Sequence, residues 1–87
     1  MFSAELKNPA LKFLKSLKDK TTLKRISNKI DELEKNPFPQ DIERVEGYKD
    51  VKIFRVRVGD YRIIYTMITD GILILRIAHR KEVYRGD

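Results

Sequence analysis

Residues 51–84 read VKIFRVRVGDYRIIYTMITDGILILRIAHRKEVY. The runs 52–58 and 61–68 alternate in polarity and are rich in β-branched and aromatic residues, which is typical of strands. A third, mainly apolar run follows Gly71. Because two turns that contain glycine separate the three runs, the sequence predicts three consecutive antiparallel strands.

The first turn, at residues 59–60, fits a two-residue hairpin loop with glycine at its first central position. Such a loop sets Val58 opposite Tyr61 and determines which side chains share a face. One face is predicted to be apolar and to form the core: Phe54, Val56, Val58, Tyr61, Ile63, Tyr65 and Met67. Arg55, Arg57 and Arg62 then lie together on the other face, with Arg57 opposite Arg62.

The second turn, at residues 69–71, is consistent with a two-residue Asp-Gly loop or with a three-residue loop that has glycine in the left-handed conformation. The two-residue loop would place Arg76 beside Tyr65 in the core, where an unpaired charge is costly. The three-residue loop produces apolar pairs instead: Met67 with Leu73, Tyr65 with Leu75, and Ile63 with Ile77. We therefore predict the three-residue loop, which also directs Arg76 and Arg80 to the arginine face.

Five arginines are thus predicted on one sheet face: Arg55, Arg57, Arg62, Arg76 and Arg80. The planar guanidinium group matches a phosphate in geometry and keeps its charge at any working pH. This face therefore indicates a polyanionic ligand. A solvated sheet face, or one covered by an acidic partner protein, is the alternative interpretation.

Length and composition narrow the possible functions. The chain of 87 residues suffices for one domain with one modest core. Its net charge of +6 and pI of about 9.7 favour nucleic acid or an acidic protein as partner. With no cysteine and one histidine, the sequence predicts no disulfide, no metal site and a cytoplasmic setting. It also predicts no membrane span and no signal peptide.

The first 40 residues predict two helices. Asn8 suits an N-cap and the proline after it suits the first helical position, so one helix should run from here to near residues 18–20. A second helix should begin at Thr21 or Thr22, either of which can cap it, and should end before the two prolines within residues 36–39.

These elements predict an α+β domain in which a two-helix hairpin packs on one face of a mainly antiparallel, three- to four-stranded sheet. Residues 2–6 are the candidate for an additional edge strand. Residues 80–84 are too short to form an element of their own, and we expect them to place Arg80 and Tyr84 at the rim of the arginine face.

Metal-free cleavage of RNA by its own 2′-hydroxyl needs positive charge on the phosphorane and groups that transfer two protons. Arg62 and Arg80 are the candidates for the charge, and Tyr84 or His79 for the proton. Packing is an equal interpretation for His79, because strand parity directs it toward the core, and Tyr84 could simply pack against the sheet end. Motifs for dinucleotides, nucleoside triphosphates, serine esterases and zinc proteases do not occur, and no cofactor is expected.

VGDYRIIY, followed by an apolar strand that closes on AHRKEVY, resembles the RelE/ParE superfamily of toxins from toxin–antitoxin modules, and the RelE branch above all. The resemblance covers nearly the whole chain. It implies a ribosome-dependent mRNA endoribonuclease that inhibits translation and is neutralised by a cognate RelB-like antitoxin. The expected partners are therefore the ribosome, mRNA and this antitoxin, with operator DNA as a further target of the toxin–antitoxin complex.

By this resemblance, the catalytic positions of the family fall on Arg62, Arg80 and Tyr84. The substrate-binding candidates are Arg55 and Arg57, with Lys52, Arg76 and His79 in addition. One basic position, a lysine in the best-known members, falls on Ile53 here. The proton acceptor is then Tyr84, His79 or a ribosomal group. Two rival functions share the same features: a ParE-like inhibitor of DNA gyrase, and a noncatalytic nucleic-acid-binding module.

Overall fold

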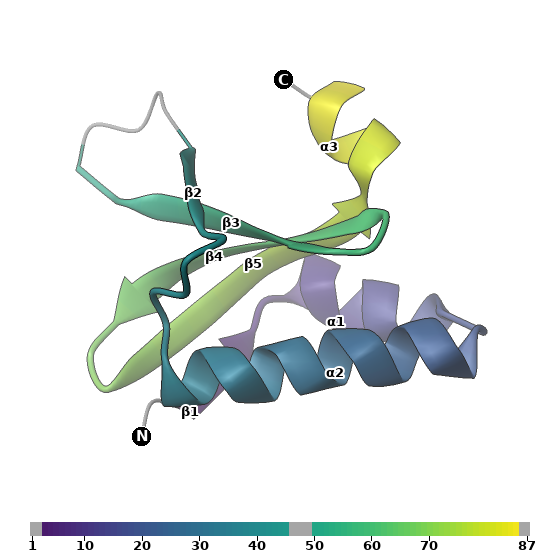
Figure 1. The fold of residues 1–87 in the computed structure, drawn as a ribbon, viewed down its shortest axis with the longest axis horizontal. Coiled ribbons are helices and arrows are strands. Elements are labelled where there is room, and N and C mark those ends of the chain that lie inside the picture. Colours follow the sequence, from purple (N-terminus) through teal and green to yellow (C-terminus); the bar gives the residue numbers. More distant parts are fainter. Residues whose placement is uncertain (1–2, 46–49, 86–87) are drawn as a thin grey trace.

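The computed structural model describes residues 3–45 and 50–85. They form one five-stranded sheet with two longer helices packed on one face and a short helix at one end (Figure 1). The strands are β1 (Ser3–Leu6), β2 (Glu43–Val45), β3 (Ile53–Val58), β4 (Tyr61–Ile68) and β5 (Gly71–His79). The helices are α1 (Asn8–Ser16), α2 (Lys20–Lys35) and α3 (Arg80–Arg85).

The strand order is β1-β5-β4-β3-β2, with β1 parallel to β5 and the other neighbours antiparallel. The predicted α+β class and the helical layer on one sheet face are confirmed. The sheet has five strands and is mixed, so the predicted three or four strands were too few. The candidate edge strand is confirmed as β1, whereas β2 was missed because three residues in a polar stretch carry no visible alternation.

The core lies between the sheet and the helices, where α1 contacts β5 and β1, and α2 contacts β1 and β3. Its largest fully buried side chains come from both layers: Tyr65, Ile26, Leu33, Ile63, Ile72, Ile74 and Val56. The predicted apolar face of β3 and β4 is therefore the core face. Among the described residues, no helix is both long enough and apolar enough to cross a membrane.

The N-cap of α1 differs from the prediction. Lys7 occupies the cap without a side-chain hydrogen bond, and Asn8 is already the first helical residue. A proline still stands in the first turn, as predicted. The helix ends at Ser16, before the predicted 18–20, because the next residue adopts an extended conformation and residues 17–19 lead into α2.

The N-cap of α2 is Asp19, so the prediction of a threonine cap was wrong. The Asp19 carboxylate accepts a hydrogen bond from the Thr22 hydroxyl (2.7 Å) and another from the Thr21 backbone N–H (3.1 Å). The bond from the Thr22 side chain is the main reason why the pKa of Asp19 is lowered. An ionised carboxylate is favoured over a hydroxyl here because it also interacts with the positive end of the helix dipole. The C-terminal end at Lys35 agrees with the prediction.

The β3–β4 hairpin has the predicted register, with Val58 opposite Tyr61 and Arg57 opposite Arg62. Gly59 has a φ of +58°, a left-handed conformation that glycine adopts without steric cost. A two-residue loop with glycine first was therefore sufficient to predict this pairing from sequence.

The β4–β5 turn differs from both loops that were considered. Ile68 pairs with Gly71, so the loop is Thr69-Asp70, and Asp70 takes the left-handed conformation with a φ of 61°. The predicted pairs of Met67 with Leu73 and of Tyr65 with Leu75 are wrong. The observed partners are Ile72 for Met67 and Ile74 for Tyr65.

A β-bulge restores the predicted register further along these strands. It lies between Ile64 and Tyr65 and leaves Leu75 as the extra residue on β5. Beyond it, Ile63 pairs with Ile77 as predicted, and Arg76 lies opposite Ile64, outside the core. The bulge therefore allows a two-residue turn without burying the charge of Arg76.

Tyr65 connects the sheet to the segment that follows α2. Its side chain is fully buried, and its hydroxyl donates a hydrogen bond of 2.7 Å to the Pro37 carbonyl oxygen. Burial raises the pKa of the hydroxyl, so this bond is present throughout the neutral range.

We expect Tyr65→Phe to lower the free energy of unfolding by about 1–3 kcal/mol, because it leaves the buried Pro37 carbonyl without its donor. Urea denaturation at pH 7 measures the loss. Tyr61→Phe is the control, since the Tyr61 ring is half-buried and would keep its contact with Phe13. An equal loss in both variants would contradict the role assigned to the Tyr65 hydroxyl.

Candidate nucleic-acid interface

Arginines from four elements meet at the turn between β3 and β4. We define the hairpin arginine cluster as Arg57 at the end of β3, Arg62 near the start of β4, Arg80 at the start of α3 and Arg25 on α2. The turn lies at the same end of the molecule as α3 (Figure 1). Three of these four arginines were predicted from sequence to share a site.

The carbonyl oxygen of Gly59 links two of the guanidinium groups. Arg57 donates to it from Nε at 3.2 Å, and Arg62 donates from Nη1 at 3.3 Å. Arg62 also donates to the Tyr61 carbonyl oxygen at 3.1 Å, and the residue is only 7% exposed. Arg62 is therefore held in one position by the backbone, whereas Arg57 is exposed to solvent.

Arg80 is attached to the same turn through its backbone. Its N–H donates a hydrogen bond of 2.7 Å to the Asp60 carbonyl oxygen, which joins the start of α3 to the hairpin. The side-chain ion pair with Asp60 is long, at 4.0 Å between Nε and Oδ1, and the Arg80 side chain is 54% exposed. This weak, exposed pair leaves the guanidinium accessible to an anion.

Arg25 reaches the turn from the helical side. A Cβ built on Gly59 would lie 3.4 Å from both terminal nitrogens of Arg25, so the guanidinium packs directly against this glycine. The sequence prediction missed it because its proximity depends on how α2 packs. A signal was present, since Arg25 is the one arginine among eight lysines in residues 1–35.

Two further predicted residues lie on the sheet away from the turn. Arg55 forms an ion pair of 3.2 Å with Glu43 of β2, and its side chain is 17% exposed. Arg76 lines a separate hollow of about 450 Å³ beside α1, together with Pro9. The five arginines predicted on one face are thus divided, and three of them converge on the turn.

His79 is directed to the core side, as strand parity predicted. It pairs with Tyr61 across the strands, and the two rings meet edge to face with centroids 5.4 Å apart. Its Nδ1 accepts a hydrogen bond of 3.2 Å from the Lys81 N–H. His79 therefore packs against the sheet and caps the start of α3, which favours the packing interpretation over proton transfer.

Tyr84 belongs to α3, so the prediction that residues 80–84 form no element was wrong. Formation of this helix is favoured by the cap from His79 and by the backbone bond from Arg80 to the hairpin, neither of which is visible from spacing. The side chain of Tyr84 lies outside the part of the chain that the structure describes.

Two more positions from the sequence analysis, Lys52 and Ile53, lie at the end of β3 opposite the turn. Lys52 immediately precedes the strand and lines a pocket beside Phe54, roughly 20 Å along the strand from the turn at about 3.3 Å per residue. Ile53, where the family resemblance expects a basic residue, is 5% exposed and opposite Thr66. This position contributes to packing and offers no group for proton transfer.

Comparison with known proteins identifies the family. Residues 4–84 match the family model described as the ParE toxin of type II toxin–antitoxin systems, parDE. The chain belongs to the RelE/ParE toxin superfamily. The matched residues include strands β3 to β5 with the VGDYRIIY motif, on which the predicted resemblance was based. They also include the hairpin arginine cluster.

Individual relatives of this RelE/ParE toxin agree. Toxin RelE3 of Methanocaldococcus jannaschii is 39% identical over 49 residues, and these cover 56% of this chain and 53% of the relative, so the chain spans about half the length of this curated protein. The archaeal RelE–RelB complex from Pyrococcus horikoshii matches with a TM-score of 0.76 at 32% identity, covering 91% of this chain and 94% of the other. The RelB–RelE complex from Methanococcus jannaschii matches with a TM-score of 0.73 at 29% identity, covering 94% and 96%.

The hairpin arginine cluster combines one buried guanidinium group with three exposed ones, an arrangement suited to an anionic ligand. Buried Arg62 offers donors that need no reorganisation, and exposed Arg57, Arg80 and Arg25 can adjust to a phosphodiester. Asp60 offsets part of the positive charge. Because guanidinium groups keep their protons, the cluster can stabilise developing negative charge but cannot act as a general base.

Proposed function

We propose that this chain is an mRNA endoribonuclease that acts on the translating ribosome and thereby inhibits translation. The observation that supports it most is that Arg57 and Arg62 donate to the Gly59 carbonyl oxygen while the side chain of Arg80 pairs with the adjacent Asp60. Three positive charges at one hairpin turn suit the binding of a phosphodiester. The activity requires the ribosome and therefore takes place in the cytoplasm.

In the proposed reaction, the 2′-hydroxyl of the message attacks the adjacent phosphorus and the bond to the 5′-oxygen breaks. The products are a 2′,3′-cyclic phosphate and a free 5′-hydroxyl. Arg62 and Arg80 stabilise the pentavalent phosphorane, and one preorganised donor of this kind is worth about 10²–10³ in rate. Arg57, which is exposed beside them, holds the RNA backbone. Arg55 is left out of this role because it lies away from the turn and pairs with Glu43.

Among the described side chains, none is well placed to transfer a proton in this reaction. Tyr84 is our first candidate for this step or for stacking on a base. The ribosome supplies the rest of the catalytic effect by orienting the message, and good orientation alone can contribute about 7–11 kcal/mol to lowering a barrier.

The partner of this toxin is proposed to be a RelB-like antitoxin. The solved relatives from Pyrococcus horikoshii and Methanococcus jannaschii are complexes of RelE with RelB. A chain with a net charge of +6 is suited to an acidic protein partner. Binding of operator DNA by the resulting complex is a further expectation.

The test is to induce the chain alone in cells and to map 5′ ends on a reporter message and on a matched message without a start codon. We expect new 5′-hydroxyl ends only in the translated message. A growth arrest with both messages intact would remove the nuclease assignment.

A second candidate is inhibition of DNA gyrase, because the matching family model is that of the ParE toxin. The buried Ile53 at a position where the nuclease branch has a basic residue is compatible with this function. Purified chain added to a gyrase supercoiling assay separates the two candidates, since a nuclease of the proposed kind leaves supercoiling unchanged.

A further inference from the structure

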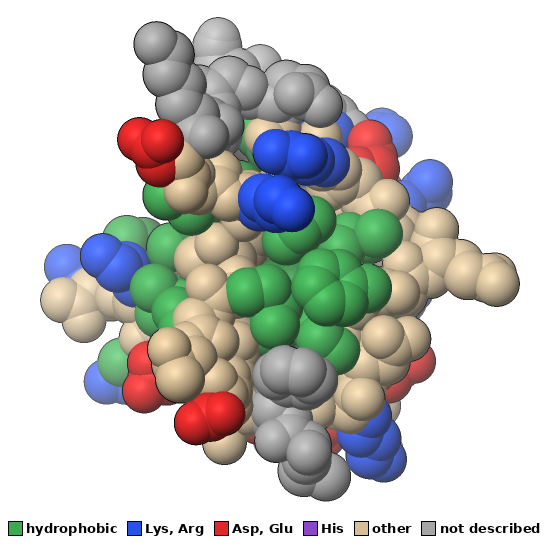
Figure 2. Space-filling model, turned by 90° about the vertical axis from the view of Figure 1, so that its left-hand side faces the viewer, with side chains coloured by type: hydrophobic (Ala, Val, Ile, Leu, Met, Phe, Trp, Pro, Cys, Tyr) green, Lys and Arg blue, Asp and Glu red, His purple; other side chains and the backbone are tan. Residues whose placement is uncertain are grey.

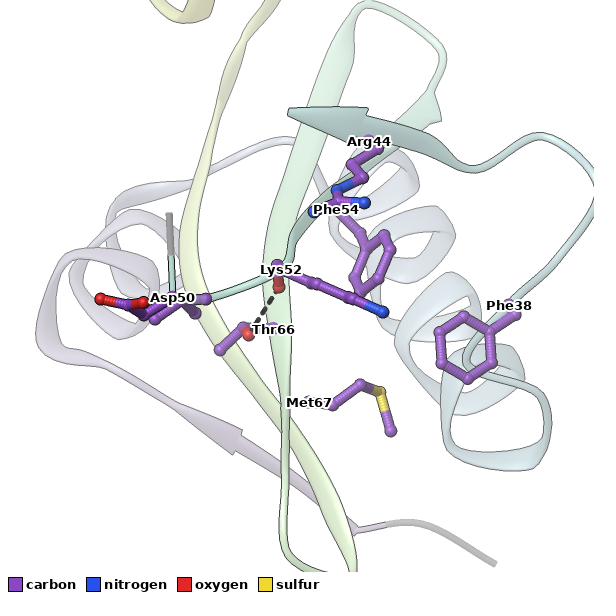
Figure 3. A pocket seen from close by; sticks show the side chains of 8 residues that line it. Phe38, Arg44, Asp50, Lys52, Phe54, Thr66 and Met67 are labelled. Carbon is purple, nitrogen blue, oxygen red and sulfur yellow. Dashed lines mark hydrogen bonds between the residues drawn. The ribbon is translucent and has the colours of Figure 1, made fainter. Parts of the chain in front are cut away.

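A pocket of about 710 Å³ lies at the end of the sheet opposite the hairpin arginine cluster. Its apolar walls come from Phe38, Phe54 and Met67 (Figure 3). Val51 also lines it. Figure 2 shows this end of the molecule, where hydrophobic side chains form a patch with lysine or arginine groups along one side. The volume falls in the ~300–1,000 Å³ range of pockets that bury drug-sized molecules, so more than one partner side chain fits.

The apolar wall is exposed and at the same time held in place. Phe38 is 53% exposed and Val51 is 48% exposed, although residues of this kind are normally buried. The Phe38 ring meets the Phe54 ring edge to face at 5.6 Å, and Phe54 in turn contacts buried Tyr65 at 5.8 Å. The Phe38 backbone N–H donates to the Asn36 side chain at 3.1 Å. An exposed aromatic ring held by such contacts offers a large apolar surface to a protein partner.

Two cations border this wall. The Lys52 side chain extends over the pocket toward Phe38, and Arg44 lies beside Phe54 (Figure 3). Within residues 3–45 and 50–85, no ion pair joins Lys52 or Arg44 to an acidic side chain. Asp50 also borders the pocket, but its carboxylate points away from the aromatic rings (Figure 3). The rim therefore favours an acidic ligand.

We propose that this pocket is the docking site for an acidic, amphipathic segment of the antitoxin. An apolar side chain of that segment enters between Phe38 and Met67, and carboxylates beside it pair with Arg44 and Lys52. The proposal rests on the proposed function, in which an antitoxin is the partner.

Charge and chemistry favour an antitoxin segment over a second copy of this chain or an RNA strand. A second copy of the chain carries the same net charge of +6 and would bring one basic rim against another. An RNA strand gains most where phosphates meet guanidinium forks, and these are concentrated at the other end of the sheet. Apolar walls are filled best by the side chains of a protein.

The pocket and the hairpin arginine cluster lie roughly 20 Å apart along β3, at about 3.3 Å per residue. Phe38→Ser should therefore weaken antitoxin binding without changing the nuclease site. Such a variant would remain toxic in the presence of its antitoxin.

Calorimetry with a purified RelB-like antitoxin that neutralises this chain in co-expression tests the proposal. We expect Phe38→Ser to raise Kd about 30-fold, the effect of an interface anchor, and Lys52→Glu to raise it about tenfold. Leu11→Ser is the matched control, because Leu11 is also an exposed large hydrophobic residue (39%) but lies on α1. It should change Kd less than twofold.

In cells, Phe38→Ser should arrest growth even when the antitoxin is co-expressed, whereas the antitoxin should neutralise Leu11→Ser. Circular dichroism melts of both variants confirm that they fold. An unchanged Kd for Phe38→Ser, or an equal loss in Leu11→Ser, would overturn the docking site. So would a dimer of the wild-type chain that Phe38→Ser converts to monomer, or a loss of RNA binding in Phe38→Ser with unchanged antitoxin affinity. Absence of mRNA cleavage by the wild type, with the Kd differences intact, would instead overturn the proposed function alone.

Discussion

Arg80→Ala is expected to lower the rate of mRNA cleavage by about 100-fold or more and to abolish growth arrest, while the fold remains intact. The guanidinium is 54% exposed, and its ion pair with Asp60 is long at 4.0 Å, so little stability depends on the side chain. In the proposed reaction, its loss removes charge from the place where negative charge develops on the phosphorane. Mapping of 5′ ends after induction, together with a thermal melt, measures both effects.

Lys81→Ala is the control for this experiment, because Lys81 is the next residue of α3, is exposed, and carries the same charge. It should leave cleavage within a few-fold of the wild type. If Arg80→Ala and Lys81→Ala reduced cleavage equally, the effect would come from overall charge and not from a site at the hairpin. Full toxicity of Arg80→Ala would exclude Arg80 from the reaction.

The role of Arg62 cannot be tested by activity alone, because its side chain is also part of the packed structure. The side chain is buried and donates to the carbonyl oxygens of Gly59 and Tyr61. Removing it leaves a cavity and deprives both carbonyls of a donor. We therefore expect Arg62→Ala to reduce stability as well as cleavage, and its melt must accompany any activity measurement.

Gly71→Ala is expected to produce the largest loss of stability, about 3 kcal/mol. A Cβ on Gly71 would collide with the backbone carbonyl of Ser3, because the two residues are partners in the parallel pairing of β1 with β5. Overpacking costs roughly 1–3 kcal/mol where side chains can move, and here the obstacle is backbone. A domain of this length has a total stability of only about 4–13 kcal/mol.

Urea denaturation of Gly71→Ala measures this loss, and hydrogen exchange of the β1 amides locates it. Asp70→Gly is the matched control at the same turn. It adds no atom and relieves the left-handed φ of 61°, so we expect a change of at most a few tenths of a kcal/mol in either direction. An unchanged urea midpoint for Gly71→Ala would show that β1 does not approach this glycine closely.

Local chemistry explains which parts of the fold were predictable. The Gly59-Asp60 loop determines the pairing of Arg57 with Arg62, because a two-residue turn leaves one register. The prolines after Lys35 end α2 because they cannot continue its hydrogen bonds. In each case the decisive atoms lie within a few residues of one another.

Contacts between distant segments explain the rest. The β4–β5 register depends on β1, which pairs closely with Gly71. It also depends on a β-bulge that the residues of the turn do not predict. The helix α3 is capped by His79 and held to the hairpin by Arg80. Neither contact is visible in the spacing of residues 80–84.

By itself, the sequence determined the apolar face of β3 and β4, the pairing at their turn and the family, since alternation and turn residues act over short distances. The tertiary structure decided which arginines form the hairpin arginine cluster. It brought Arg25 from α2 and Arg80 from α3 to the Gly59 turn, and it left Arg55 paired with Glu43. The physical reason is that charge convergence depends on the packing of elements far apart in the chain, and this packing follows from burial of the whole core.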